Sequence, residues 1–462
     1  MNIAMDSFAK WDAVETAEQL AKKNVSPREV MEAAIRRAEA VGPLGAFVTP
    51  TFERALDETK ALRPGLFSGV PSALKDLVQQ RGTPTSFGSR GGAKLPAPKN
   101  EKWVDAFEGL GFISLGKTAT PELGLTATTE AVGFAACKNP WDPTRSSGGS
   151  SGGAAVLVAS GVVPLAHGSD GGGSIRIPAA ACGLVGLKPT RGRFDMEGSN
   201  TLPVNVAVQG VLTRTVRDTV AFWDAMSRVA PRSSMPKMTP TAGAAKRKLR
   251  IGVSTALPRV TVDPEHVEAV NAVAKKLESL GHTVEPVPHT IDEQFMDDFL
   301  SYWSVVAFLQ SSTMKYVAQK GFNQALYDVW TSELVRRFHA ARLDNVKATL
   351  RLRKFHQRFL AQFNRVDVLL TPTLAQPPPV LGFLSPEVDS KAQFERLSQY
   401  VPFTPAYNAS GAPAISLPLA QTKSGLPIGL QFGANMGNEA TLLELAAELE
   451  VAMPWPHTAP QR

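Results

Sequence analysis

Residues 139–192 read NPWDPTRSSGGSSGGAAVLVASGVVPLAHGSDGGGSIRIPAAACGLVGLKPTRG and hold 12 of the 37 glycines of the 462-residue chain. Two glycine-rich turns that contain serine, GGSSGG at 148–153 and DGGGS at 170–174, enclose a short apolar segment. Because glycine has no Cβ, a ligand can closely approach the main-chain N–H groups of such turns. Several N–H groups directed at one point form an oxyanion hole. The stretch therefore predicts a site where backbone donors bind a negatively charged oxygen.

Three other interpretations of this stretch fit its sequence less well. A flexible Gly/Ser linker would not alternate with AAVLVASGVVPLA, which has the composition of a protein core. A phosphate-binding loop is weakly supported, because neither GxxxxGK[ST] nor GxGxxG occurs here. The GxSxG pattern of a nucleophile elbow does occur, but it follows WDPTR instead of an apolar strand, and no HGGG segment comes after it. We therefore set the elbow aside.

The overall composition is that of a globular enzyme, with 43% hydrophobic and 20% charged residues. The net charge of +7 is small for this length, so nucleic-acid binding has no further support. Two cysteines, Cys137 and Cys182, exclude a disulfide framework and suit a reducing compartment. The N-terminal sequence lacks the features of a signal peptide, and no uninterrupted apolar stretch of about 18 residues occurs. We expect a cytoplasmic protein that has no membrane partner.

The quoted stretch resembles the signature of the amidase signature family of serine hydrolases. NPW, GGSSGG, DxGGSIRxP and CGxxGLKPTxG all occur in the family's order, and Ser174 lies 24 residues after Ser150, the spacing that we associate with the family. The resemblance implies a Ser-cisSer-Lys triad. In that triad Ser174 is the nucleophile, Ser150 follows a cis peptide at Gly149, and a lysine lies upstream.

Lys75 is the lysine that fits the triad. It ends an apolar run in which burial would oppose its charge, and its segment GVPSALKD resembles the family's lysine motif. We expect Asp76 beside it to be a structural carboxylate. Lys117, in GKTATPE, is a rival base, but its segment lacks the lysine motif and resembles the family's GKTNxPE, so we favour a surface or ion-pair role. Ala119 stands there in place of the expected Asn, a departure that bears on hydrogen bonding near the site but removes no member of the triad.

The predicted mechanism is amide hydrolysis through an acyl-enzyme. Ser174 attacks the carbonyl carbon, and Ser150 relays its proton to a neutral Lys75. The oxyanion is expected to be held by four backbone N–H groups, those of Gly171, Gly172, Gly173 and Ser174.

Other polar residues of the stretch are expected to support the loop. We expect Asp170 and Arg176 to brace it by an ion pair, with Ser151 as a further support. His167, beside two apolar residues, is interpreted as a hydrogen-bonded core residue, and Cys182 as a small hydrophobic one. The seven histidines are scattered without metal-ligand spacing, so no metal or other cofactor is expected.

Alternating strand and helix patterns predict an α/β fold. The resemblance implies one domain over residues 1–462, with a mixed sheet between helical layers and a signature core at 66–215. Residues 1–65 are expected to hold helices, one of them opened by a capping box at Ser26. Residues 249–287 are expected to form a β-α-β unit, and the helical region 293–360 is expected to line the cleft.

The substrate is expected to be an uncharged aryl or alkyl amide, with carbamates and esters also accepted. Aromatic residues are frequent at 295–330 and basic residues are few before Arg336, which predicts an apolar, fairly wide cleft. The HGSD form of the loop resembles the branch that contains nylon-oligomer (6-aminohexanoate cyclic-dimer) hydrolases and aryl acylamidases. We expect a monomer or homodimer acting on a small-molecule amide. The alternatives are the glutaminase subunit of a tRNA-dependent amidotransferase and an inactive protein that only binds acyl compounds.

Overall fold

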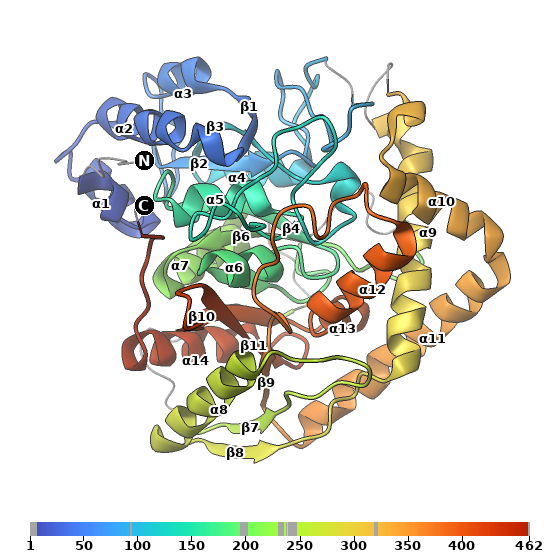
Figure 1. Ribbon diagram of the computed structural model, residues 1–462. Helices are drawn as coiled ribbons and strands as arrows, with labels where there is room; N and C mark the ends of the chain where they lie inside the picture. Colours follow the sequence, from blue (N-terminus) through green and yellow to red (C-terminus); the bar gives the residue numbers. More distant parts are fainter. Residues whose placement is uncertain are drawn as a thin grey trace.

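The computed structural model describes residues 7–92, 95–194, 202–229, 235, 236, 238, 247–317 and 322–460. Its central feature is an eight-stranded sheet that runs through the middle of the molecule (Figure 1). In spatial order the strands are β4 (Leu165–Asp170), β6 (Val208–Thr213), β5 (Val185–Lys188), β10 (Ala414–Gln421), β11 (Pro427–Ala434), β9 (Val368–Pro372), β7 (Arg250–Val253) and β8 (Thr283–Pro286). The pairs β7–β8 and β7–β9 are parallel and the other neighbours are antiparallel, so the sheet is mixed.

Helices cover both faces of this sheet because the strands are apolar on both sides. On β10, Ala414 packs into one hydrophobic cluster, while its neighbour Ile415 packs into the other. The first face carries α5 (Gly152–Ala159) and α6 (Arg176–Cys182). The second carries α7 (Val216–Val229), α8 (Pro264–Ser279) and α14 (Glu439–Ala452). The predicted α/β fold, a mixed sheet between helical layers, is thus confirmed.

A second, three-stranded sheet joins the N-terminal region to the core. Its order is β1 (Phe47–Pro50), β3 (Ile113–Thr118) and β2 (Pro71–Lys75). The helices of this region are α1 (Ala13–Ala21), α2 (Pro27–Ala40), α3 (Phe52–Glu58) and α4 (Lys102–Gly109). The capping box predicted at the start of α2 is present, with Glu29 N donating to Ser26 Oγ and Ser26 N donating to the Glu29 carboxylate.

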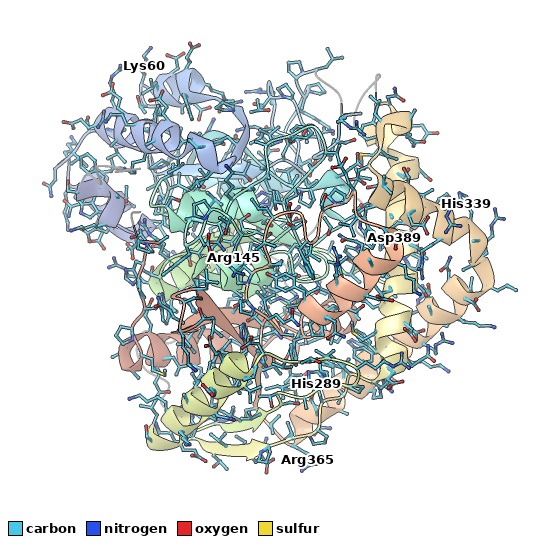
Figure 2. The ribbon with its side chains drawn as sticks, viewed as in Figure 1. Lys60, Arg145, His289, His339, Arg365 and Asp389 are labelled. Carbon is cyan, nitrogen blue, oxygen red and sulfur yellow. The ribbon has the colours of Figure 1, made fainter. Side chains whose placement is uncertain are left out.

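The region 293–360 is helical, as predicted, and stands at one side of the molecule (Figure 1). It consists of α9 (Glu293–Val317), α10 (Val329–Ala340) and α11 (Arg342–Ala361), and α12 (Ser390–Tyr400) and α13 (Pro405–Ser410) connect it to the sheet. Short 3₁₀ helices lie at Ser7–Lys10, Gly42–Leu44, Glu122–Gly124, Gln324–Leu326 and Gln362–Asn364. Charged side chains such as Lys60 and Arg365 lie at the outer edge of the molecule (Figure 2). The predicted β-α-β unit corresponds to β7, α8 and β8.

A buried pair of carboxyl groups, Glu122 and Asp328, joins the core to α10. Ser89 Oγ donates to Glu122 Oε1 at 2.6 Å, and the backbone N–H of Asp328 donates to Glu122 Oε2 at 2.9 Å. Asp328 in turn caps α10 by accepting from Thr331 N. Burial and the nearby Asp328 charge raise the pKa of Glu122 from 4.5 to about 7. Burial also raises the pKa of Asp328.

This raised pKa predicts that stability falls as the pH rises. Between pH 4.5 and about 7 the unfolded chain has released the Glu122 proton that the native protein retains, so unfolding becomes easier through that window. Glu122→Gln has no proton to lose, yet its amide keeps an acceptor for Ser89. We expect wild type to lose up to about 3 kcal/mol of stability across the window and the variant to lose less. Thermal melting at several pH values tests this, and parallel curves for the two proteins would contradict it.

Candidate active site

Three segments far apart in the sequence bring together the residues that the motifs singled out. Lys75 ends β2, Ser150 lies in the glycine-rich turn before α5, and Ser174 lies in the turn before α6. Lys75 Nζ is 2.7 Å from Ser150 Oγ, and the Gly149–Ser150 peptide bond is cis. The largely buried Ser174 lines a cleft. Lys75 and Ser150 are thus in contact, and Ser174 lines the same cleft as Gly124, which lies beside Ser150.

Lys75 is fully buried, and its amine is surrounded by hydroxyl groups. Besides Ser150, its Nζ lies 2.9 Å from Ser151 Oγ and 3.0 Å from Ser169 Oγ. Among the described residues, no carboxylate lies within ion-pair distance of this amine. Burial lowers the pKa of Lys75 from 10.5 to about 7, while the charge of Asp170 acts in the opposite direction. A large fraction of the lysine is therefore neutral at neutral pH.

Two glycines of the turns are required by close approach of other segments. A Cβ on Gly149 would lie 2.6 Å from the carbonyl oxygen of Thr128. Gly173 has a φ of +130°, and a Cβ there would lie 2.3 Å from Thr404 Oγ1. Neither position admits a side chain, so the glycines set the paths of both serine-containing turns.

The loop after β4 is braced by a buried ion pair. Arg176 Nη2 and Nε donate to Asp170 Oδ1 and Oδ2 at 2.9 and 3.0 Å, and neither side chain is exposed. Asp170 also accepts from the N–H groups of Gly173 and Ile175. Burial alone would raise the pKa of Asp170, but the Arg176 charge and its hydrogen bonds outweigh that effect and hold the pKa at about 2. Asp170 is therefore ionised and fully engaged.

The same contacts decide which backbone donors remain open to a ligand. The N–H of Gly173, one of the four expected oxyanion donors, donates to Asp170 Oδ1 at 2.8 Å and so points into the loop. In the part of the chain that the structure describes, the N–H groups of Gly171, Gly172 and Ser174 have no acceptor. Gly171 and Gly172 lie against the aromatic side of the cleft, and a Cβ at Gly171 would be in van der Waals contact with Trp303 at 3.4 Å.

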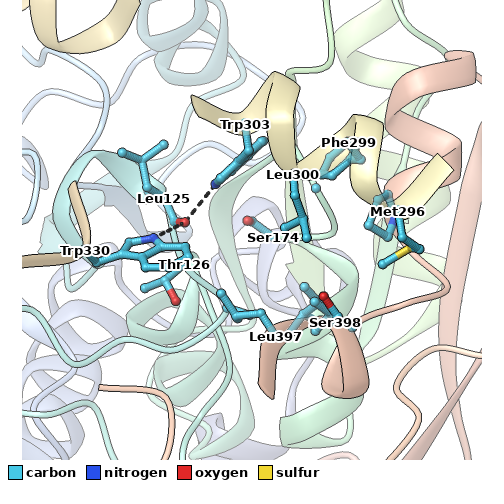
Figure 3. Close-up of a pocket in the computed structure, with 16 residues that line it drawn as sticks. Leu125, Thr126, Ser174, Met296, Phe299, Leu300, Trp303, Trp330, Leu397 and Ser398 are labelled. Atoms are coloured by element: carbon cyan, nitrogen blue, oxygen red, sulfur yellow. Dashed lines mark hydrogen bonds between the residues drawn. The ribbon is translucent and has the colours of Figure 1, made fainter. Parts of the chain in front are cut away.

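The cleft beside Ser174 is apolar (Figure 3). Two indole N–H groups, from Trp303 on α9 and Trp330 on α10, donate to the same acceptor, the carbonyl oxygen of Leu125. No residue lining the described cleft is charged. Its walls are Gly124, Leu125, Thr126, Ala127, Gly172, Ser174, Ile177, Met296, Phe299, Leu300, Trp303, Trp330, Leu397, Ser398, Val401 and Pro405.

Only some of the aromatic residues at 295–330 reach this cleft. Phe299, Trp303 and Trp330 line it, whereas Tyr302 is buried against Val204 through its hydroxyl group. The sequence did not indicate which of these aromatic side chains would line the cleft, because helix periodicity alone does not show which side of a helix borders a cavity.

The other residues that the sequence analysis considered make contacts that stabilise the fold. Lys117 is buried and paired with Asp76 at 3.0 Å, as the ion-pair interpretation predicted. His167 is buried and hydrogen-bonded, again as predicted. In the described residues there is no group of His, Cys, Asp and Glu side chains suited to a metal ion. None of the described helices combines the length and apolar character needed to cross a bilayer.

Sequence reasoning missed several residues that hold the site. Ser169 contacts the Lys75 amine, and it alternates with His167 on β4, so a period of two could have placed both on the side facing Lys75. Arg176 is held by Asn408 and Gln431 from the C-terminal part of the chain. No local signal connects those two positions to the signature.

Comparisons with known proteins agree with this geometry. Residues 29–443 match the model of the Amidase family. A Mycobacterium leprae protein assigned as an amidase, AmiC, is 42% identical over 455 residues that cover 97% of each chain. The structure of 6-aminohexanoate cyclic dimer hydrolase with its substrate superposes with a TM-score of 0.90 at 32% identity, covering 99% of both chains. A bacterial aryl acylamidase of the amidase signature family has a TM-score of 0.83 at 26% identity and 96% coverage of both chains.

The family match spans most of the chain, and these relatives are named for the hydrolysis of amides. The chain with the serine-rich turns and the buried lysine therefore belongs to the amidase signature family, and it is an enzyme that hydrolyses the C–N bond of amides.

Proposed function

We propose that this amidase cleaves uncharged aryl or alkyl amides through an acyl-enzyme, with Ser174 as nucleophile, Ser150 as proton relay and Lys75 as base. The position of Lys75 is the observation that carries the proposal. Its amine is buried, lies among hydroxyl groups, approaches Ser150 Oγ to 2.7 Å, and has no carboxylate in contact within the described part of the chain. An amine with a pKa of about 7 accepts and returns a proton at neutral pH.

The hydroxyl groups around the amine suit its neutral form. A neutral amine has two N–H donors and one lone pair. Ser151 Oγ donates onward to the carbonyl oxygen of Ser169, so Ser151 accepts from Lys75, and Ser169 Oγ is placed to accept the second donor. The lone pair is then left for the Ser150 hydroxyl. Ser150 is thereby oriented to give its proton to Lys75 and to take one from Ser174.

The reaction follows in two halves. Ser174 Oγ bonds to the carbonyl carbon as its proton passes through Ser150 to Lys75 Nζ. When the C–N bond breaks, that proton returns along the same path to the leaving amine, and the acyl group remains on Ser174. Water then attacks the ester carbon and gives one proton to Lys75 by the same route. That proton returns to Ser174 Oγ as the ester C–O bond breaks, and the carboxylic acid is released. The backbone N–H groups of Gly171, Gly172 and Ser174 hold the oxyanion in both halves.

The walls of the cleft support an uncharged, apolar substrate. The indole N–H groups of Trp303 and Trp330 are both used by Leu125 O, so they present carbon surface to a ligand. Without a cation among the lining residues, the described cleft offers no partner for the carboxylate of glutamine, which disfavours the glutaminase alternative. Carbamates and esters present the same carbonyl group to the nucleophile, so we propose that they are accepted as well. We propose that a monomer or homodimer acts in the cytoplasm without a cofactor, nucleic acid or membrane.

Replacing the nucleophile tests the first step. Ser174→Ala should abolish turnover and labelling by a fluorophosphonate probe. It should change the free energy of unfolding by no more than about 0.5 kcal/mol, because this hydroxyl has no partner among the described residues. Activity-based labelling and thermal melting of wild type and variant measure both effects. Probe labelling that survives the substitution would assign the nucleophile elsewhere.

The pKa of Lys75 predicts the pH profile. Only the neutral amine accepts a proton. The logarithm of kcat/KM should therefore rise with unit slope below about pH 7 and level off above it. Lys75→Arg should be almost inactive because a guanidinium group stays protonated. Lys75→Met, which removes the buried amine, serves as the folding control. A Lys75→Arg enzyme with the rate of wild type would exclude the base role.

A substrate series tests the cleft. We expect a hexanoyl anilide and a phenyl carbamate to exceed acetamide and glutamine in kcat/KM. Compared with acetanilide, the extra methylenes of the hexanoyl chain should gain up to about 3 kcal/mol if the apolar wall buries them. If acetamide or glutamine is the better substrate, the apolar-cleft assignment is wrong.

A further inference from the structure

The proposed base and the loop that carries the nucleophile belong to different sheets. Lys75 ends β2 of the three-stranded sheet, whereas the DGGGS loop follows β4, the outer strand of the eight-stranded sheet. Besides the contact of the Lys75 amine with Ser169, hydrogen bonds connect β2 with β4 at two places: Ser72 Oγ donates to the carbonyl oxygen of Leu165 at 2.8 Å, and Lys75 N donates to His167 Nδ1 at 3.1 Å. The second bond fixes the backbone of the lysine itself. His167 is therefore the contact that ties the Lys75 backbone to β4 at the active site.

The hydrogen bonds of His167 determine its tautomer. The Lys75 backbone N–H can only donate, so Nδ1 must be the unprotonated nitrogen. Nε2 then carries the proton and donates to Gln209 Oε1, 2.9 Å away on β6. The ring is fully buried, with Trp103 and Phe107 close by. Both nitrogens are thus used, and the ring has one orientation and one tautomer.

The surroundings of His167 also keep it neutral. Burial lowers its pKa to about 3, the Gln209 hydrogen bond opposes this, and the nearby charges of Lys75 and Lys117 lower it further. Lys117 on β3 is itself paired with Asp76, and the other charged group near Lys75 is Asp170 at the end of β4. His167 therefore places a hydrogen-bond acceptor at Lys75 without bringing a titrating charge to the base.

We propose that His167 is a positioning residue for amide hydrolysis, holding Lys75 in register with the loop that carries Ser174 through its unprotonated Nδ1. The proposal rests on the proposed role of Lys75 as base. Without this acceptor, the Lys75 N–H would be buried and unpaired, and the end of β2 would shift or admit water to pair it. Either change would alter the contacts of the amine with Ser150 and reduce the burial that keeps it neutral.

The chain provides a matched control, because His282 makes the same pair of contacts elsewhere. Its Nδ1 accepts the backbone N–H of Leu249 at 3.1 Å, and its Nε2 lies 2.9 Å from Glu448 Oε2. This buried ring joins the residue before β7 to α14, and neither of its described hydrogen bonds is with a residue of the proposed triad. Replacing it should affect stability alone.

The experiment compares His167→Leu, His167→Asn and His282→Leu with wild type. Asn keeps a side-chain oxygen near the position of Nδ1, whereas Leu removes the acceptor. Three quantities are measured: the pH dependence of kcat/KM for an anilide, the titration of Lys75 by NMR with ¹³Cε-labelled lysine, and the melting temperature. Gln209→Met, which removes only the acceptor of Nε2–H, is added in case His167→Leu fails to fold.

We expect His167→Leu to lose about tenfold or more in kcat/KM at neutral pH, the order of loss for an unpaired buried donor. Its pH profile and the Lys75 titration should both move upward by about one unit, since a less buried amine is protonated more easily. Gln209→Met should shift in the same direction by less, and His167→Asn should recover most of the activity. His282→Leu should lower the melting temperature and leave the pH profile in place.

The proposal is overturned if Lys75 titrates at the same pH in His167→Leu as in wild type. If His167→Leu does not fold, the same comparison is made between Gln209→Met and wild type. The proposal is also overturned if His282→Leu shifts the profile equally, since the effect would then be loss of stability alone. The NMR titration needs no substrate. It therefore decides the role of His167 even if the purified enzyme hydrolyses none of the amides tested, a result that would count against the proposed function instead.

Discussion

The rest of the site depends on one constraint: a lysine amine held in the protein interior with no carboxylate partner among the residues that the structure describes. Lys75 and Lys117 are equally buried, but Lys117 is paired with Asp76, whereas the amine of Lys75 meets hydroxyl groups. Hydroxyl groups stabilise an ammonium ion much less than a carboxylate does, so burial determines the protonation of Lys75. These two equally buried lysines thus differ in the partners of their amines, a carboxylate for Lys117 and hydroxyl groups for Lys75, and not in depth.

Keeping Lys75 neutral requires that the charge of Asp170 be balanced, because that carboxylate acts to raise the pKa of the lysine. Arg176 supplies the balance with two hydrogen bonds to Asp170. Its other donors are held by Asn408 on α13 and Gln431 on β11. A buried ion pair is stable only when its remaining donors and acceptors are satisfied. Residues of α13 and β11 therefore help to balance the charge of the signature loop, although they contribute no group to the proposed triad.

Strand and helix patterns in the sequence predicted the fold class, because strands that need apolar residues leave local patterns, and the resemblance to the amidase signature family implied the meeting of Lys75 with Ser150. The sequence did not predict contacts between distant segments. The use of Gly173 N–H by Asp170, the hold of Asn408 on Arg176, and the convergence of two indoles on Leu125 O depend on how elements pack. His167 lies between these two cases, because only part of its environment was predicted. Its burial was predicted from its neighbours, but its bond to Lys75 arises only where two sheets meet.

The aromatic wall of the cleft and the proposed catalytic groups come from different parts of the chain. Phe299, Trp303 and Trp330 belong to α9 and α10, which join the core through the Leu125 carbonyl and the Glu122–Asp328 pair. Lys75 ends β2, and the two serines belong to the signature turns. Substitutions on α9 and α10 can therefore reshape the cleft without moving the amine of Lys75. This separation gives a physical reason why relatives of one fold carry the names of a cyclic-dimer hydrolase and an aryl acylamidase.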